Sequence, residues 1–592
     1  MPTYKAPLRD LRFVYYELFD GERLTGLPGY EEATPELVMD VLGEAGRFAE
    51  KVLQPLNKIG DQEGCRFEAG KVFTPTGFKE AYKIYQESGW PAVTAPPEFG
   101  GQGLPYSLGS MLTEILCSAN LSFAMSTALS HGACAALEQH ATQELKQAFL
   151  PHLIDGSWAG TMCLTEPQSG TDLGLVRTRA EPAEGGAWKI TGTKIFISAG
   201  EHDLTPNIVH LVLARLPDAP AGIKGISLFV VPKLREEGGK LLPNRVCCGS
   251  IEHKMGIKAS PTCVINFDGA LGYLVGEPHK GMKAMFTFMN GARLHVGVQG
   301  LALAEAAYQG AVQFARERLQ GRSLTGPKYP DQEADPILVH PDVRRMLLTV
   351  RAMVEGMRAL TAWTSLEIDH AEHDPDPARA EAGDDMASLM TPIVKAFQTD
   401  LGFESTNLAL QVCGGYGYTT DYGMEQLVRD CRITQIYEGT NGVQALDLVG
   451  RKMPAHMGRY LRRFFHPVQE FLAAQEGDAR MEEFATPVAK AFERLQRATA
   501  WLAQESLKNP DQAGAASVEF LHLFGYVALG YLWARMARVA LDKRGREDAA
   551  FYEAKLATAR FFVQRVLPRH SALFANVMAG SATLMEFPDS AF

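Results

Sequence analysis

The 592-residue sequence lacks the marks of a membrane, secreted or metal-binding protein. It has no run of about 18 apolar residues, so we expect no membrane-spanning helix. Residues 1–7 lack the basic and then apolar layout of a secretion signal. The nine cysteines are scattered without a Cys-x-x-Cys pair, which favours free thiols in a reducing cytoplasm. The histidines form no cluster with ligand spacing, so we predict no metal site.

Common nucleotide-binding and catalytic signatures are also missing. No Gly-x-Gly-x-x-Gly follows a predicted strand, and neither a Walker motif nor His-Glu-x-x-His is present. The formal net charge of −11 argues against a general nucleic-acid surface, although Arg459, Arg462 and Arg463 form a small basic cluster. Composition and spacing alone therefore leave any cofactor unidentified.

What is present divides the chain into helical and β segments. Apolar residues at three- and four-residue spacing predict helices within 35–160, interrupted by a Pro- and Gly-rich loop at 96–105. β-Branched and turn residues then predict a compact β domain. Its expected elements are a hairpin at 188–198, with a turn at Gly192-Thr193, and strands at 208–216, 226–231 and 263–267.

Helical patterns return after residue 280 and continue to the end of the chain. The acidic stretch 369–385 is most simply explained as a solvated loop or helix end. Regularly placed aromatic residues after 455 predict a packed domain rather than a tail. A chain of this length is expected to form several domains. We predict four: 1–159 helical, 160–280 β, 281–455 helical, and 456–592 an additional helical domain.

The clearest chemical signal lies in the segment Gln435-Ile436-Tyr437-Glu438-Gly439-Thr440-Asn441. It places one carboxylate beside a glycine in a mostly apolar neighbourhood. Burial raises the pKa of a carboxylate, and such a group can act as a base toward a carbon acid. Taken alone, Glu438 is more simply explained as an exposed charge at a helix end.

Other segments accompany Glu438 in order along the chain. They are Met162-Cys163-Leu164-Thr165-Glu166-Pro167-Gln168-Ser169-Gly170-Thr171-Asp172, Phe196-Ile197-Ser198, Arg293, Arg318 and Gln411-Val412-Cys413-Gly414-Gly415-Tyr416-Gly417. Each alone has an ordinary structural explanation as a turn, core aromatic, surface charge or helix cap. In combination, over roughly residues 35–450, they resemble the acyl-CoA dehydrogenase family of flavoenzymes.

The resemblance implies a mostly α fold with a central β domain, the acyl-CoA dehydrogenase fold, and the cofactor FAD. In that family the segment around Thr165 lies along the flavin, an aromatic ring at the position of Phe196 covers it, and a hydroxyl at Ser198 approaches its N5. The residues expected at the flavin end are Met162, Leu164, Thr165, Thr171, Phe196, Ser198, Thr440 and Asn441.

The same resemblance implies contacts with the other end of FAD. Arg318 matches an arginine that binds the pyrophosphate across a subunit boundary, and a guanidinium suits phosphate oxygens. The phenylalanine that the family usually has after the position of Gln320 is missing here. Glycines at 414 and 415 match a loop whose backbone approaches a neighbouring subunit's FAD. The residues expected at this end are Arg318, Gln320, Gln411, Gly414 and Gly415.

For the substrate, the resemblance implies an acyl-CoA that contacts Thr171, Asn290, Arg293 and Gly439. Glu438 corresponds to the base that removes the α proton while the β hydride leaves for the flavin, which gives a trans-2-enoyl-CoA. The backbone N–H of this glutamate and a ribityl hydroxyl of FAD hold the thioester carbonyl, like an oxyanion hole.

Ordinary family members end soon after the segment of Glu438, so this chain resembles the longer bacterial acyl-CoA dehydrogenases. These tend to be dimers, and we predict a homodimer. Small residues at 121–131 favour a medium to long acyl chain, as in the first step of fatty acid β-oxidation, with electron-transferring flavoprotein as acceptor. Three alternatives stay open: a methylthiopropanoyl-CoA dehydrogenase, an acyl-CoA oxidase that uses O2, and a DNA-associated protein on the same fold.

Overall fold

The computed structural model describes residues 3–545 and 548–592, which divide into two compact units. Unit 1 holds the N-terminal segment up to residue 46, residues 106–118 and residues 296–592. Unit 2 holds residues 47–105 and 119–295. Two long helices, α5 (Tyr106–His140) and α7 (Gly281–Glu317), contribute residues to both units.

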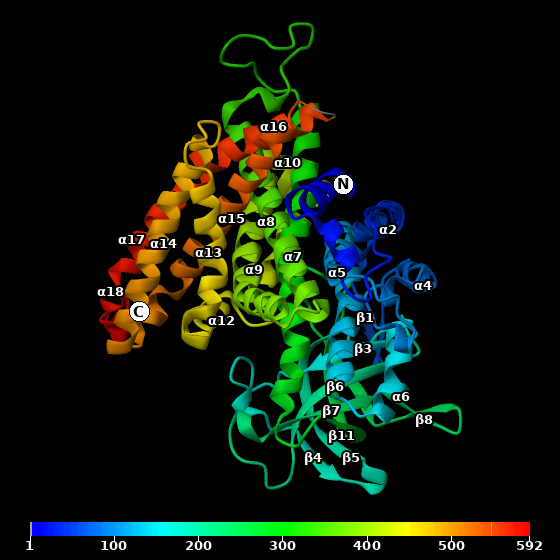
Figure 1. Ribbon diagram of the computed structural model, residues 1–592. Helices are drawn as coiled ribbons and strands as arrows, with labels where there is room; N and C mark the ends of the chain where they lie inside the picture. Colours follow the sequence, from blue (N-terminus) through cyan, green and yellow to red (C-terminus); the bar gives the residue numbers. More distant parts are fainter. Residues whose placement is uncertain (1–2, 546–547) are drawn as a thin grey trace. The chain divides into compact units, whose positions relative to one another are not determined.

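Unit 2 is built around the predicted β domain (Figure 1). Its main sheet has seven strands, in which β3 runs parallel to β6 and most other pairs are antiparallel. Its further elements are α3 (Gln54–Glu63), β1 (Arg66–Glu68), β2 (Lys71–Phe73), α4 (Phe78–Glu87), α6 (Gln143–Ile154), β3 (Trp158–Cys163), β4 (Arg179–Pro182), β5 (Trp188–Ser198), β6 (Asn207–Arg215), β7 (Ile226–Pro232), β8 (Leu234–Glu237), β9 (Lys240–Pro243), β10 (Val246–Ile251) and β11 (Thr262–Val275).

Five of these strands close into a barrel. β6 pairs with β7, β7 with β11, β11 with β5, β5 with β4, and β4 again with β6. Every residue of β7 is buried, as expected for a strand covered on both faces. The interior is apolar and includes Ile190, Val212, Phe229 and Ile265. The predicted strands at 208–216, 226–231 and 263–267 are thereby confirmed.

The predicted hairpin at 188–198 is wrong, because β5 is one continuous strand. Gly192 and Thr193 lie in its middle and pair with Phe267 and Asn266 of β11. The glycine is needed for packing and not for a turn. A Cβ at Gly192 would come within 2.3 Å of the Thr178 hydroxyl, so a glycine here allows close approach of the neighbouring chain.

Unit 1 is helical. Around parts of α5 and α7 it contains α1 (Leu8–Arg12), most of α2 (Pro35–Phe48), α8 (Pro341–His373), α9 (Pro377–Val412), α10 (Gly415–Tyr418), α11 (Met424–Arg432), α12 (Asn441–Asp447), α13 (Arg459–Ala474), α14 (Glu482–Lys508), α15 (Asp511–Lys543), α16 (Ala549–Phe561), α17 (His570–Ala579) and α18 (Ala582–Met585). Helices α8 and α9 pack against each other over most of their length.

The acidic stretch 369–385 is only partly the solvated segment that we expected. Asp369 is fully buried and accepts hydrogen bonds from the backbone N–H groups of Tyr106 and Ser107 at 2.7 and 3.1 Å. It thus caps the start of α5, and burial raises its pKa to about 7. Asp385 is also buried, beside Arg459 and Arg463.

The residues after 455 form a packed helical domain, as predicted, and we call α13–α18 the C-terminal extension. Its central helix α15 packs against α14, α16 and α17 and also against α8, α9 and α12 (Figure 1). Phe520, Phe524 and Trp533 are fully buried, and the Trp533 indole N–H donates to the carbonyl of Ala352 at 3.0 Å. The extension therefore shares its core with the rest of unit 1.

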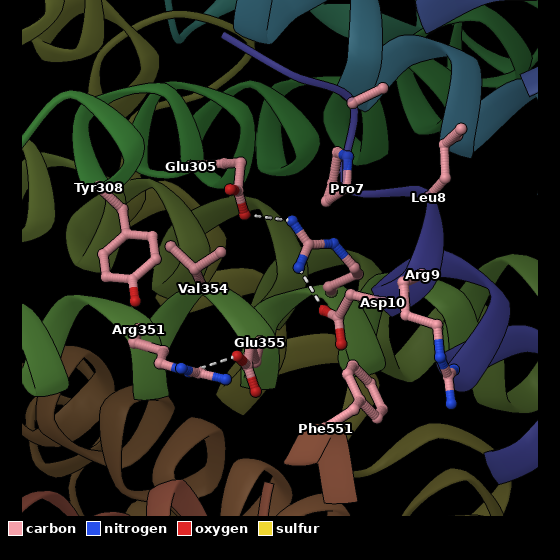
Figure 2. Close-up of a pocket in the computed structure, with 12 residues that line it drawn as sticks. Pro7, Leu8, Arg9, Asp10, Glu305, Tyr308, Arg351, Val354, Glu355 and Phe551 are labelled. Carbon is pink, nitrogen blue, oxygen red and sulfur yellow. Dashed lines mark hydrogen bonds and ion pairs between the residues drawn. The ribbon is translucent and has the colours of Figure 1, made fainter. Parts of the chain in front are cut away.

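A buried ionic network within unit 1 joins segments from both ends of the sequence, and Figure 2 shows the part of it around Asp10, Glu305 and Glu355. Arg358 of α8, 2% exposed, contacts Asp10, Glu114 and Glu305. Lys555 of α16 contacts Asp10 and, at 2.7 Å, Glu355. A cavity of about 350 Å³ opens beside this network. Removing one partner of a buried ion pair is costly, so the network fixes α1 and α16 on α8.

Two described helices, α5 and α15, are long and apolar enough to cross a membrane, judged by length and composition alone. Their most apolar stretches are 89% and 78% buried inside the protein, as in core helices. The expectation that no helix spans a membrane stays a prediction. All nine cysteines are free. Among the residues that the structure describes, no group of three or more acidic, His or Cys side chains is placed to hold a metal ion.

Candidate active site

Glu438 lies in a short loop between the 3-10 helix Ile433–Gln435 and α12. Its side chain is half-buried. Its backbone has φ +58°, and the next residue, Gly439, has φ +86°. A non-glycine residue with positive φ is strained by roughly 1–3 kcal/mol, and such strain gathers at functional sites. The loop thus holds the backbone of Glu438 in a strained conformation, as is common at functional sites.

Side chains around the loop hold its backbone. The Gln444 side-chain amide donates to the carbonyl of Glu438 at 3.1 Å and to that of Gly439 at 3.4 Å. The Tyr437 hydroxyl donates to Gln299 of α7. The Thr440 hydroxyl accepts from the N–H of Val443 and so caps α12. The Thr440 hydroxyl therefore has a structural role as a helix cap, and its contact with FAD stays a prediction.

Asn441 ties the same loop to α9. Its amide nitrogen donates to the carbonyl of Ala396 at 3.1 Å and to Asp400 at 2.7 Å, and its amide oxygen accepts from Lys395 at 2.8 Å. Both ends of the Asn441 side chain are therefore bonded within unit 1. Lys395 and Asp400 were not predicted. Their signal in the sequence is a pair of opposite charges within the otherwise apolar middle of a long helix.

In unit 2, the segment of Thr165 leaves the end of β3 and lies beside β5. Met162 is half-buried within β3, Leu164 is buried, and Thr165 is half-buried. The carbonyl of Thr165 accepts from the N–H of Ile195 at 2.9 Å. The segment after β3 and the neighbouring part of β5 are thus side by side, while the predicted contacts of 162–171 and 196–198 with the flavin stay predictions.

A buried ion pair that sequence reasoning missed fixes this junction. Lys194 of β5 donates to Glu166 at 2.8 Å and to the carbonyl of Leu164 at 2.9 Å, and both charged side chains are at most 3% exposed. Glu166 also accepts from the Thr178 hydroxyl at 2.6 Å. Burial raises the pKa of Glu166, but Lys194 and the hydrogen bonds outweigh it and lower the pKa to about 2.

Phe196 occupies a bulge in β5. Pairing with β11 shifts between Ile197 and Lys194, so that one extra residue lies on β5, and Phe196 takes φ +57°. Such bulges redirect a side chain. The ring is 59% exposed, which is unusual for a phenylalanine within a strand. An exposed aromatic on a strained backbone matches a ring that covers a flat cofactor.

The remaining predicted residues of unit 2 lie in loops, at a strand end and on α7. Ser198 is half-buried at the end of β5, and Thr171 is exposed in the loop after β3. On α7, Asn290 is exposed and Arg293 is half-buried, with its guanidinium carbon 5.9 Å from the Phe286 ring centre. Their contacts with substrate stay predictions.

The residues predicted to bind the adenosine end gather on the surface of unit 1. The guanidinium carbon of Arg318 lies 5.7 Å from the ring centre of Tyr416, the residue that follows Gly415. The guanidinium also donates to the side-chain oxygen of Gln320 at 3.2 Å. Gln411, Gly414 and Gly415 are exposed. A Cβ at Gly414 or Gly415 would meet no atom within 4 Å. The space beside these glycines is open to a ligand or to another protein chain.

The residues present fit FAD. Unit 2 offers an exposed aromatic face and the backbone of 162–165, while unit 1 offers a guanidinium beside two glycines whose backbone is open. A guanidinium suits pyrophosphate oxygens, and glycine permits close approach of a ligand. The predicted residues of unit 1 are Glu438, Gly439, Thr440, Asn441, Arg318, Gln320, Gln411, Gly414 and Gly415, and the others belong to unit 2.

Four family models match successive parts of the chain. They are described as acyl-CoA dehydrogenase N-terminal domain (residues 39–157), middle domain (161–270) and C-terminal domain (279–453), and as acetyl-CoA dehydrogenase C-terminal like (464–588). The last match corresponds to the C-terminal extension, which the sequence pattern predicted as a domain of its own.

Curated relatives and solved structures agree with these matches. A 3-methylmercaptopropionyl-CoA dehydrogenase from Ruegeria pomeroyi is 46% identical over 97% of this chain and 98% of its own length. The broad-specificity linear acyl-CoA dehydrogenase FadE5 of Mycobacterium tuberculosis is 34% identical over the whole of both chains. An acyl-CoA dehydrogenase from Bacillus anthracis, solved with FAD, shares the fold with a TM-score of 0.75 at 22% identity, covering 93% of this chain and 89% of its own. With all four models matched in order, the chain belongs to the acyl-CoA dehydrogenase family of FAD-dependent enzymes, in a long form with a C-terminal helical domain.

Proposed function

We propose that this acyl-CoA dehydrogenase acts on 3-methylmercaptopropionyl-CoA and on linear acyl-CoAs of similar, short length. The observation that carries the substrate is the 46% identity, over nearly the full length of both chains, to a relative named for that compound. Relatives named for linear acyl-CoAs are 34% identical over comparable lengths.

The chemistry rests on Glu438. FAD, when bound, supplies the acceptor for the β hydride. Glu438 removes the α proton from C2 of the thioester, and its backbone N–H helps to hold the thioester carbonyl as negative charge develops there. The bonds from Gln444 and Asn441 keep the loop in place during this step, so the base need not be reorganised when substrate arrives.

Packing accounts for part of the small-residue pattern that favoured a long acyl chain. We expected the small residues at 121–131 to leave room for such a chain, but Ser130 is small because β3 lies against it. The Ser130 hydroxyl accepts from the N–H of Gly160 at 3.0 Å, and Phe123 fills an aromatic cluster with Phe48 and Tyr85. A medium to long acyl-CoA is the second candidate, supported by the broad-specificity linear relative.

The test combines one variant and one substrate panel. Replacing Glu438 with Gln removes the base with little change of size, so we expect FAD to stay bound and kcat to fall by a factor on the order of 10² to 10⁴. Bleaching of the flavin by acyl-CoA at the wild-type rate would contradict the role of Glu438. The panel compares 3-methylmercaptopropionyl-CoA with straight acyl-CoAs of increasing length, using an artificial electron acceptor. A kcat/KM that rises steadily toward long chains would favour the second candidate.

Electron-transferring flavoprotein is the acceptor that we propose, with a homodimer as the assembly and the cytoplasm as the compartment. A structural relative titled as an electron-transferring flavoprotein study is 27% identical over 71% of this chain, which supports that kind of partner. Hydrogen peroxide formed in step with turnover would indicate an oxidase instead, and a tetramer in light scattering would contradict the dimer.

The basic cluster does not support the alternative of a DNA-associated protein. Arg459 and Arg463 are ion-paired with Asp385 and Glu381, and Arg462 donates to the carbonyl of Met457. Cations that are neutralised within the fold contribute little to binding phosphates.

A further inference from the structure

The carboxylate of Asp400, on α9, bonds to both ends of the loop that carries Glu438. Its Oδ1 accepts from the Gln435 amide at 2.6 Å and from the Asn441 amide at 2.7 Å. Gln435 and Asn441 flank the five residues that contain Glu438. The position of Asp400 therefore sets where the loop begins and where it ends.

The second oxygen of this carboxylate is held by a residue from the C-terminal extension. The Nε2–H of His522, on α15, donates to Asp400 Oδ2 at 2.8 Å. Because a carboxylate only accepts, this bond places the proton on Nε2. Burial would raise the pKa of Asp400, but the bonds from His522, Gln435 and Asn441 lower it, so the group stays ionised and accepts all three.

Tight packing fixes His522 on α9. Its ring stands edge-on to Phe397 with ring centres 5.5 Å apart, and a Cβ at Gly525, three residues further along α15, would come within 2.5 Å of the same phenylalanine ring. The ring of Tyr526 packs edge-on against the same phenylalanine, with ring centres 4.9 Å apart. The helix cannot slide without opening these contacts.

The loop needs this support because its backbone is strained at Glu438 and Gly439. A strained conformation persists only when surrounding contacts over-determine it. Without the His522 bond, the Asp400 carboxylate can rotate and no longer aligns Gln435 and Asn441 together. A displacement of the base by about 1 Å is enough to slow proton removal by up to about 100-fold.

We infer that His522 is a positioning residue for the dehydrogenation, and that the C-terminal extension, through His522 and Asp400, holds the catalytic base in place. The inference rests on the proposed role of Glu438 as the base. It assigns to the extension a part in catalysis beyond the stability of the fold.

The experiment compares H522F, H522Q and Y526F in the full-length holoenzyme. Phenylalanine at 522 keeps a ring against Phe397 but has no donor, and glutamine keeps a donor. Y526F, on the same helix, keeps the ring that packs on Phe397 and removes only a hydroxyl that is bonded to Arg569. The assays use 3-methylmercaptopropionyl-CoA and butyryl-CoA, each also deuterated at C2, with an artificial electron acceptor. Thermal unfolding is recorded for every variant.

We expect H522F to lower kcat about tenfold with KM within about twofold, and to raise the isotope effect from C2 deuterium, because proton removal becomes slower. H522Q should recover most of kcat, and Y526F should keep kcat and the isotope effect of the wild type. The double variant D400N/H522F should be no slower than D400N, since both residues act in one chain of contacts.

Three results would overturn the inference: H522F with an unchanged kcat and isotope effect, H522Q as slow as H522F at wild-type stability, or effects of D400N and H522F that multiply. E438Q, measured in the same series, separates this failure from that of the proposed function. An inactive E438Q beside a fully active H522F rejects only the role of His522, whereas an active E438Q rejects the base and the inference together.

Discussion

The two groups of predicted cofactor residues in unit 1 differ in how they are held. Around Glu438, the side chains of Gln444 and Asn441 are bonded within the fold. Around Arg318, the two glycines at 414 and 415 face open space and the neighbouring Tyr416 is 44% exposed. The first group is braced before any ligand binds, and the second is open.

The two regions differ because a base and a phosphate-binding surface have different geometric requirements. A base must be within a fraction of an ångström of the proton that it removes, so its loop is fixed by the protein itself. A phosphate-binding surface acts by charge and by lack of obstruction, which needs little support. We therefore expect substitutions in braced regions to cost stability or catalytic rate, and substitutions in the open region to cost FAD affinity alone.

The largest effect should follow from removing a brace in unit 2. K194M leaves the buried carboxylate of Glu166 without its cation, which costs about 3–5 kcal/mol in the free energy of unfolding. K189M is the matched control, because Lys189 lies on the same strand and is exposed. Urea unfolding measures both. A decrease in the unfolding free energy of less than about 1 kcal/mol for K194M would show that the ion pair does not stabilise this junction.

The same ion pair predicts a pH dependence. The pKa of Glu166 is lowered from 4.5 to about 2 in the folded protein. Such a group stabilises the fold fully above its unfolded pKa, and this contribution is lost as the pH falls toward its folded pKa. The excess stability of the wild type over E166Q should therefore decline as the pH falls from about 4.5 to about 2. Urea unfolding at several pH values measures it, with E184Q as an exposed control. An excess that stays constant down to pH 2 would contradict the lowered pKa.

The smallest change in stability is expected in the open region. R318A removes an exposed side chain, so the unfolding free energy of the apoprotein should change by less than about 0.5 kcal/mol. The dissociation constant of FAD should rise by about 10- to 100-fold, because the predicted contact of this guanidinium with the pyrophosphate would be lost. R316A, two residues earlier and also exposed, is the control. Equal FAD affinity in both variants would remove Arg318 from the cofactor site.

Much of this organisation could be predicted from the sequence, because domain order and motifs are local patterns. The helical ends, the central β domain and the extension were all expected. The hairpin was not observed, since the need for glycine at 192 comes from Thr178, which lies just before β4. The buried role of Asp369 depends on the start of a helix more than 250 residues earlier.

The contacts that hold the site were out of reach for the same reason. Lys194 meets Glu166 across 28 positions, and His522 meets Asp400 across 122. Neither spacing has a characteristic pattern in sequence. Residues that perform the chemistry belong to recognisable motifs, whereas the residues that hold them are defined only by the three-dimensional packing.

The left-handed backbone at Glu438 has a consequence for engineering this enzyme. Glycine would adopt that geometry without penalty, so the native residue keeps the folded chain below its highest attainable thermal tolerance. With Glu438 as the proposed base, a laboratory selection for heat resistance alone would favour loss of the carboxylate and would enrich stable but inactive proteins. Directed evolution of this scaffold must therefore screen turnover and durability together.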